Sequence, residues 1–110
     1  MGDVPARRPS PAAEDLDEVW HALASGWRRQ ILDLLRRRTC TTAELWVALG
    51  PAKLSRFAVM QHLGVLQRAG LVLRRRRGRT TYNVLDPAPL QQICRQWLSV
   101  FRGLPRPRHS

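Results

Sequence analysis

The sequence predicts a mainly α-helical domain that carries one small β-hairpin. Five segments have apolar residues at the three- and four-residue spacing of an amphipathic helix. Between the fourth and the fifth, two short runs rich in apolar and β-branched residues flank Arg77–Gly78, as in a hairpin. Glycine and proline separate most of these segments, so the predicted order is α-α-α-α-β-β-α.

The chain has 110 residues, which is enough for one small domain and too few for two. Residues 1–13 (MGDVPARRPSPAA) and 103–110 (GLPRPRHS) are rich in proline and arginine and hold few large apolar side chains. We expect both segments to be flexible tails. The predicted folded domain therefore spans residues 14–102.

The first helix is expected to begin at Glu14–Asp15, because acidic side chains are favoured in the first turn. Ser25–Gly26 ends it, and a second helix follows. The arginines of this second helix lie off its apolar face. They would either make flanking contacts to a partner or form solvated surface. The apolar faces are formed by Leu16, Val19, Trp20 and Leu23 in the first helix and by Trp27, Ile31, Leu34 and Leu35 in the second.

The third and fourth helices have recognisable ends. Thr41 or Thr42 begins the third, with Glu44 at the capping-box position after Thr41, and Gly50–Pro51 ends it. Ser55 is the expected N-cap of the fourth helix, which runs from Arg56 to Ala69 and is followed by Gly70. Its inward stripe comprises Val59, Leu63 and Leu66, joined by His62 and Val65.

The hairpin and the last helix complete the domain. The strands are Leu71–Leu73 with the arginines that follow, and Thr80–Leu85. Asp86–Pro87 is a typical helix start, and the last helix is expected to continue to about Phe101. Its apolar stripe comprises Leu90, Ile93, Cys94, Trp97, Leu98 and Phe101.

Charge points to a polyanionic partner. The chain has 19 basic and 8 acidic residues, a formal net charge of +11, and 18 of the basic residues are arginine. Hydrophobic residues make up 44%, and no apolar run reaches the ~20 residues of a membrane span. No apolar stretch follows Met1, so we expect a cytoplasmic protein without a signal peptide and without membrane contact. Nucleic acid is a better candidate partner than a membrane surface.

The order of the elements is that of a winged helix-turn-helix, in which the fourth helix would be the recognition helix and the hairpin the wing. Arginine and glutamine pair with base edges in the major groove, apolar side chains contact thymine methyls, and glycine lets a phosphate approach closely. The candidate recognition residues are Ser55, Arg56, Phe57, Met60, Gln61 and Gly64. The candidate wing residues, mainly for phosphates, are Arg74, Arg75, Arg76, Arg77, Arg79 and Thr80.

Structural roles for the same side chains stay open. Phe57 and Met60 would also suit packing against the preceding turn, and Arg56 and Gln61 a solvated helix face. His62 is expected to fill a structural position in the fourth helix.

The segment from His62 to Val72 (HLGVLQRAGLV), running into the basic hairpin, resembles the ArsR/SmtB family of bacterial winged-helix transcriptional repressors. The similarity extends over about residues 19–101. It implies a homodimer that binds double-stranded DNA at a near-palindromic promoter site. The first and last helices would form the dimer interface, through Leu16, Val19, Trp20, Leu90, Ile93, Cys94, Trp97, Leu98 and Phe101.

The sequence departs from the metal-sensing members of that family. Trp46 and Ala48 stand where the thiol sensors have two cysteines, and the last helix has no His, Asp or Glu. We therefore predict no metal site and no cofactor, and the sequence assigns no effector. Cys40 and Cys94 are expected to be plain buried thiols.

Other classes of function remain as alternatives. One is a basic winged-helix module that binds RNA or the ribosome, although aromatic stacking residues are few. Another is a module that binds a protein partner. An enzyme is not expected, because the sequence has no glycine-rich phosphate loop and no defensible Ser/His/Asp or Cys/His arrangement.

Overall fold

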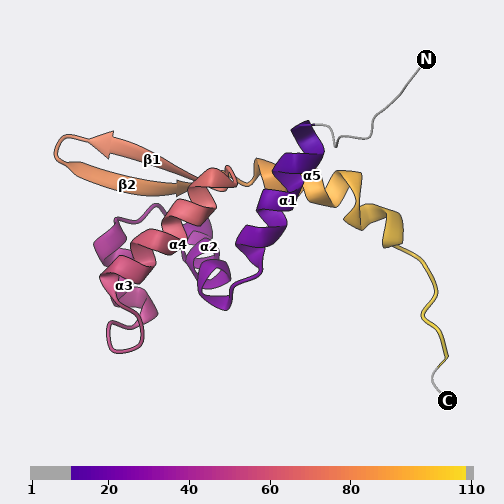
Figure 1. Ribbon diagram of the computed structural model, residues 1–110, viewed down its shortest axis with the longest axis horizontal. Helices are drawn as coiled ribbons and strands as arrows, with labels where there is room; N and C mark the ends of the chain where they lie inside the picture. Colours follow the sequence, from indigo (N-terminus) through magenta and orange to yellow (C-terminus); the bar gives the residue numbers. More distant parts are fainter. Residues whose placement is uncertain (1–10, 109–110) are drawn as a thin grey trace.

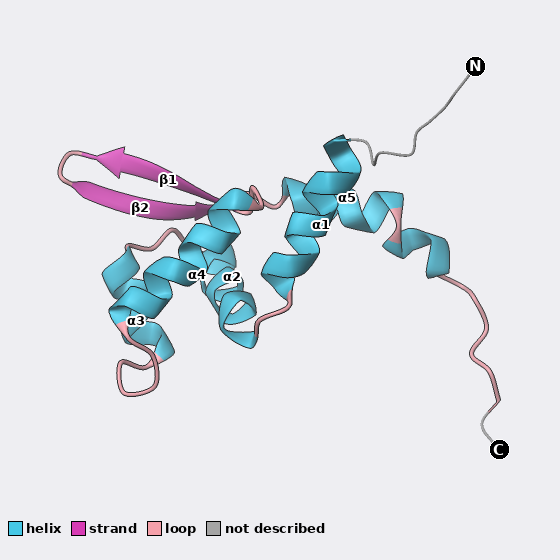
Figure 2. Ribbon diagram, in the orientation of Figure 1, coloured by secondary structure: helices cyan, strands magenta, loops and turns pink. Residues whose placement is uncertain are grey.

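The computed structural model describes residues 11–108 and confirms a mainly α-helical winged fold with one antiparallel hairpin. Figure 1 shows the hairpin projecting at one end of the molecule, with α1 and α5 together at the opposite end. Figure 2 shows that helices make up most of the domain. The elements are α1 Pro11–Leu23, α2 Gly26–Arg37, α3 Thr42–Leu49, α4 Arg56–Arg68, β1 Val72–Arg77, β2 Thr80–Leu85, α5 Ala88–Gln96 and a 3₁₀ turn, η1, Leu98–Phe101.

Helix α1 begins at Pro11, three residues before the predicted start at Glu14, so residues 11–13 belong to a helix and not to the predicted tail. Proline suits this place, because the first turn of a helix does not use its backbone N–H groups. Residues 1–10 lie outside the described residues. At the other end, residues 104–108 contain neither helix nor strand.

Three helix starts have a side-chain cap, of which those at Thr41 and Ser55 were predicted and the one at Ser25 was not. Ser25 Oγ accepts a hydrogen bond from Arg28 N, and Ser55 Oγ accepts one from Ala58 N. Thr41, rather than Thr42, caps α3: its hydroxyl accepts from Glu44 N at 3.1 Å, and the Glu44 carboxylate accepts from Thr41 N at 2.8 Å. This reciprocal pair is a complete capping box.

The hairpin has a regular register, from Val72 opposite Leu85 to Arg77 opposite Thr80. Gly78 turns the chain with a φ of 63°, in the left-handed region that glycine adopts without strain. At the base of the wing, Asn83 forms an isolated bridge with Cys40. The second strand is therefore held on both sides.

One core unites α1–α5 and the base of the hairpin. It confirms the inward stripe of α4, because Val59, Leu63 and Leu66 are all buried. Leu32, which the sequence analysis did not place on the apolar face of α2, is buried as well. The core comprises Val19, Ala22, Ile31, Leu32, Leu35, Cys40, Leu45, Leu49, Val59, Leu63, Leu66, Ala69, Leu71, Val72 and Ile93.

The last helix is shorter than predicted. Helix α5 ends at Gln96, Trp97 leaves the helical conformation, and η1 follows instead of a helix continuous to Phe101. Trp97, Leu98 and Phe101 are about half exposed, so the domain covers this part of the apolar stripe only in part. Most of the stability of a short helix comes from packing of its apolar face, and beyond Gln96 that packing is incomplete.

Candidate nucleic-acid interface

Helix α4 has one buried face and one open face. Phe57 is 68% exposed and Met60 is 54% exposed, and Arg56 and Gln61 are exposed beside them. Both side chains are thus more than half exposed, whereas the structural alternative, packing against the preceding turn, would bury them. The open face carries one cation, one amide and two apolar side chains, a combination suited to base edges and thymine methyls.

The turn that leads into α4 is fixed by a tryptophan. Trp46 Nε1 on α3 donates to the carbonyl oxygen of Leu54 at 2.8 Å, directly before the N-cap Ser55. The bond sets where α4 begins relative to α3. The sequence indicates Trp46 as an apolar residue of this helix, in the place of a sensor cysteine, and does not reveal this positioning contact, which joins residues eight positions apart.

Gly64 lies on the open face, but Arg68 covers it. A Cβ at Gly64 would lie 3.6 Å from Arg68 Nη1, so the guanidinium folds back by one helical turn onto the glycine. A group that approaches the backbone at Gly64 thus meets a cation. The spacing of four residues between Gly64 and Arg68 could have shown this in the sequence.

Arg28 connects three elements, a role that the sequence analysis did not distinguish from surface charge. Its Nε donates to Ala22 O at 2.8 Å and its Nη2 to His21 O at 3.0 Å, at the end of α1. Its Nη1 lies 3.2 Å from Nδ1 of His62 on α4. Burial, and secondly the charge of Arg28, hold the pKa of His62 below its ordinary value of 6.5. The neutral ring is therefore favoured, with Nδ1 free to accept from Arg28.

The arginines of the wing are all exposed. The register places Arg75 opposite Tyr82 and Arg74 opposite Asn83. Because side chains alternate along a strand, Arg75 and Arg77 lie on one face of the hairpin, and Arg74 and Arg76 on the other. Arg76 Nε donates to Gly78 O at 3.0 Å, which holds its side chain against the turn. The arginines of this run therefore differ in environment.

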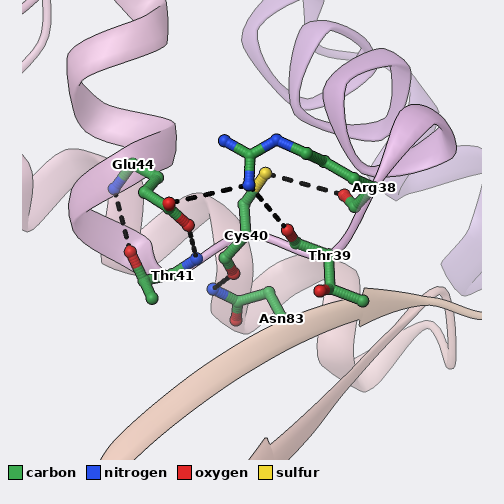
Figure 3. Close-up of polar contacts among 6 residues, drawn as sticks. All are labelled: Arg38, Thr39, Cys40, Thr41, Glu44 and Asn83. Carbon is green, nitrogen blue, oxygen red and sulfur yellow. Dashed lines mark hydrogen bonds and ion pairs between the residues drawn. The ribbon is translucent and has the colours of Figure 1, made fainter.

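The base of the wing is tied to the start of α3, as Figure 3 shows. Asn83 is fully buried, and its Nδ2 donates to Cys40 O at 3.1 Å and to Thr42 Oγ1 at 3.4 Å. Its backbone N–H donates to the same Cys40 carbonyl at 2.7 Å. Beside this link, Arg38 pairs with Glu44 at 3.6 Å on the surface.

The candidate dimer residues divide into three groups by exposure. Val19 and Ile93 were wrong as interface residues, because they are 1% and 2% exposed in the core of their own domain. Leu16 and Leu90 are partly buried against that core. An apolar group remains open on α1, α5 and η1: Trp20, Cys94, Trp97, Leu98 and Phe101. Within it, the Trp97 ring packs edge-on against Trp20 at 5.9 Å and Phe101 at 4.9 Å.

The two thiols lie in different environments. Cys40 is buried, and burial raises the pKa of its thiol. Cys94 is exposed, so the expectation that both are buried was wrong for this residue. Within residues 11–108 no three His, Cys, Asp or Glu side chains gather as a possible metal site. No helix in the same range is long and apolar enough to cross a membrane.

Known proteins similar to this chain are transcriptional regulators. The HTH-type transcriptional regulator YuzN of Bacillus subtilis is 34% identical over 86 residues, 74% of this chain and 94% of that protein. The HTH-type transcriptional regulator Rv2034 of Mycobacterium tuberculosis is 42% identical over 91 residues, 79% of this chain and 82% of that protein. A search of family models found no match.

Solved structures agree with this relationship. An ArsR-like transcriptional regulator from Rhodococcus sp. RHA1 superimposes with a TM-score of 0.74 at 28% identity, over 83% of each chain. The shared architecture is a set of five helices with one two-stranded antiparallel hairpin. The family consists of DNA-binding regulators and not of enzymes. This chain belongs to the ArsR family of winged helix-turn-helix transcriptional regulators.

Proposed function

We propose that the protein is a homodimeric repressor that occupies a near-palindromic promoter site. Helix α4 would lie in the major groove, where the base edges would be contacted by Ser55, Arg56, Phe57, Met60 and Gln61. Gly64 would allow a phosphate to come close to the helix backbone. The wing would contact the flanking backbone through Arg74, Arg75, Arg76, Arg77, Arg79 and Thr80. A bound dimer would exclude RNA polymerase by occupying the promoter.

The open face of α4 is the observation that carries this proposal. Phe57 is 68% exposed although it is a large apolar side chain near the N-terminus of a capped helix. Together with the exposed Met60, three residues further along the helix, it forms an apolar area beside polar groups, which is typical of an interaction site. Arg56 and Gln61 on the same face supply the polar groups that pair with bases, and the wing places further cations nearby.

The second half of the proposal concerns the dimer. The exposed aromatic group on α1, α5 and η1 lies at the end of the molecule away from the wing (Figure 1). A second copy packed on this group would leave both recognition helices free. Two such helices would reach half-sites about 34 Å apart, one turn of DNA.

Binding to the promoter of the protein's own gene tests the DNA part of the proposal. Fluorescence anisotropy at two salt concentrations should show binding at least ~10³-fold tighter than to a scrambled duplex. The chain's charge of +11, doubled in a dimer, should make the affinity fall steeply with salt. If no promoter segment binds more tightly than the scrambled duplex, the proposal is wrong.

Sedimentation of a matched pair of variants tests the dimer. Trp97→Asp places a charge in the aromatic group and should halve the molecular mass. Val47→Asp changes another exposed apolar residue, on α3, and should leave the mass unchanged. A wild-type protein that sediments as a monomer at micromolar concentration would contradict the dimer but not DNA binding itself.

A further inference from the structure

A cleft of about 510 Å³ lies between the start of α2 and the side of α4. Arg28, His62 and Arg68 line it, with Gln61 and Gly64 from the open face of the recognition helix. No carboxylate is among the residues that line it. Two guanidinium groups and an imidazole therefore share one concave surface with no neutralising acid.

The guanidinium of Arg28 is only partly used by the protein. A guanidinium has five N–H donors, and three of them serve Ala22 O, His21 O and His62 Nδ1. In the described part of the chain Arg28 has no ion pair with a carboxylate. The bonds to α1 and α4 fix the orientation of the group, while its charge and two N–H donors remain available.

Arg68 supplies the second charge of the cleft. Its Nη1 lies over Gly64, at the distance of an ordinary contact from where a Cβ would be. The position is exposed, so the guanidinium can adjust to a ligand without disturbing the core. His62 contributes an acceptor that orients Arg28, and the exposed Gln61 also lines the cleft.

The position of the cleft on α4 indicates which anion would enter it. A helix in the major groove, which is ~12 Å wide, lies between two phosphate backbones. The outward residues of α4 would face the base edges, and the cleft lies to one side of them, between α4 and α2. The group of DNA beside that flank is a phosphodiester.

We propose that this cleft binds one backbone phosphate of each half-site, held by Arg28 and Arg68, with His62 orienting Arg28. The inference rests on the proposed function, because it requires α4 in the major groove. It adds two contacts from outside the wing. It also makes Arg28 a phosphate ligand, where the sequence left this residue as either a flanking contact or solvated surface. The oriented guanidinium would also fix how deeply α4 enters the groove.

The salt dependence of operator binding tests the proposal. Arg68→Gln should lower the slope of log K against log salt by about 0.9 per lost phosphate contact in each half-site. Arg95→Gln removes an equal charge from an exposed position on α5, and its slope should match the wild type. Arg28→Lys keeps the charge but not the fork of donors, and should weaken operator binding while the circular dichroism spectrum is retained.

A scan with single methylphosphonates, which neutralise one phosphate at a time, locates the contact. At one position in each half-site, neutralisation should weaken the wild type clearly and Arg68→Gln much less. If neutralisation at every position weakens the binding of both proteins equally, the phosphate site is wrong, but the proposed repressor function is not affected. If wild-type protein does not prefer its operator, the proposed function itself fails and this inference fails with it.

Inorganic phosphate, titrated into the free protein at constant ionic strength, separates the two sources of a phosphate group. The His62 ring resonances should shift only at high millimolar concentration. Tight binding of free phosphate without a methylphosphonate effect would overturn the DNA contact in favour of a small phosphorylated ligand.

Discussion

The backbone N–H of Asn83 and its side-chain amide both donate to the carbonyl oxygen of Cys40, at 2.7 and 3.1 Å. Residue 83 lies in the second strand of the wing, and residue 40 precedes the capped start of α3. In the reverse direction, Cys40 N donates to Asn83 O at 3.2 Å. These bonds tie the wing to the start of α3.

Replacement of Asn83 by alanine should lower the free energy of unfolding by about 1–3 kcal/mol. The change leaves Thr42 Oγ1 without its partner and opens a small cavity in a fully buried site. Thr80→Ala, at an exposed position of the same strand, should stay within about 0.5 kcal/mol of the wild type. Urea denaturation of the three proteins at the same protein concentration measures the difference. Equal losses of unfolding free energy in the two variants would refute the role of the buried amide.

Stability should fall as the pH is lowered through about 6.5, because the folded state disfavours protonation of His62. With the folded pKa below the unfolded one, the unfolded chain binds more protons in this range, so acidification favours unfolding. The loss begins near the unfolded pKa and is complete below the folded one. Denaturation at about pH 7.5 and about pH 5.5 measures it. His62→Gln should reduce this loss, whereas His21→Gln, at an exposed position, should retain it.

Substitutions on the open face of α4 should change sequence preference. Arg56→Ala or Gln61→Ala is expected to weaken operator binding by about 1–3 kcal/mol and to relax discrimination at one base pair per half-site. Binding to a panel of single-base operator variants measures both effects. An equal loss on operator and scrambled duplexes would assign these residues to the backbone instead.

The wing should contribute to DNA binding independently of the base sequence of the DNA. Arg75→Ala is expected to weaken operator and scrambled duplexes alike and to reduce the salt slope, because phosphates are the same at every base pair. Affinities at four salt concentrations provide the measurement. A change in base preference with an unchanged salt slope would show that Arg75 reads bases.

A thiol reagent should distinguish the two cysteines. Cys94 is exposed and should react quickly, whereas Cys40 is buried with a raised pKa and should react only as the domain opens. Mass spectrometry of Cys40→Ser and Cys94→Ser separates the two rates. Cys94 should be modified more slowly at concentrations at which the proposed dimer forms. A Cys94 rate that is the same across dilution would place this residue outside the interface.

Much of the fold was predictable because its signals are local. The capping box of Thr41 and Glu44 involves residues three apart, and Gly70 and Gly78 adopt the left-handed conformations that end a helix and turn a hairpin. The inward stripe of α4 follows from helical periodicity. The same periodicity left its opposite side for a partner, and the exposed positions of Arg56, Phe57, Met60 and Gln61 agree with that prediction.

Periodicity was less informative in the last helix. The stripe from Leu90 to Phe101 predicts one continuous helix and one interface, but Ile93 is buried in the core and the helix ends at Gln96. A stripe shows which residues avoid water and does not show which surface covers them. The same ambiguity placed Val19 in the interface when it belongs to the core.

The family, the order of the elements and the basic character of the wing were predictable from the amino-acid sequence, because they depend on composition and on neighbours within one or two turns. The roles of Arg28, Trp46 and Asn83 became visible in the folded chain, because their hydrogen bonds join segments that are separate in the sequence. Arg28 and His62 are 34 residues apart in the chain. Such partners meet only when burial of a shared core brings the helices together, so no local pattern distinguishes Arg28 from the exposed arginine next to it.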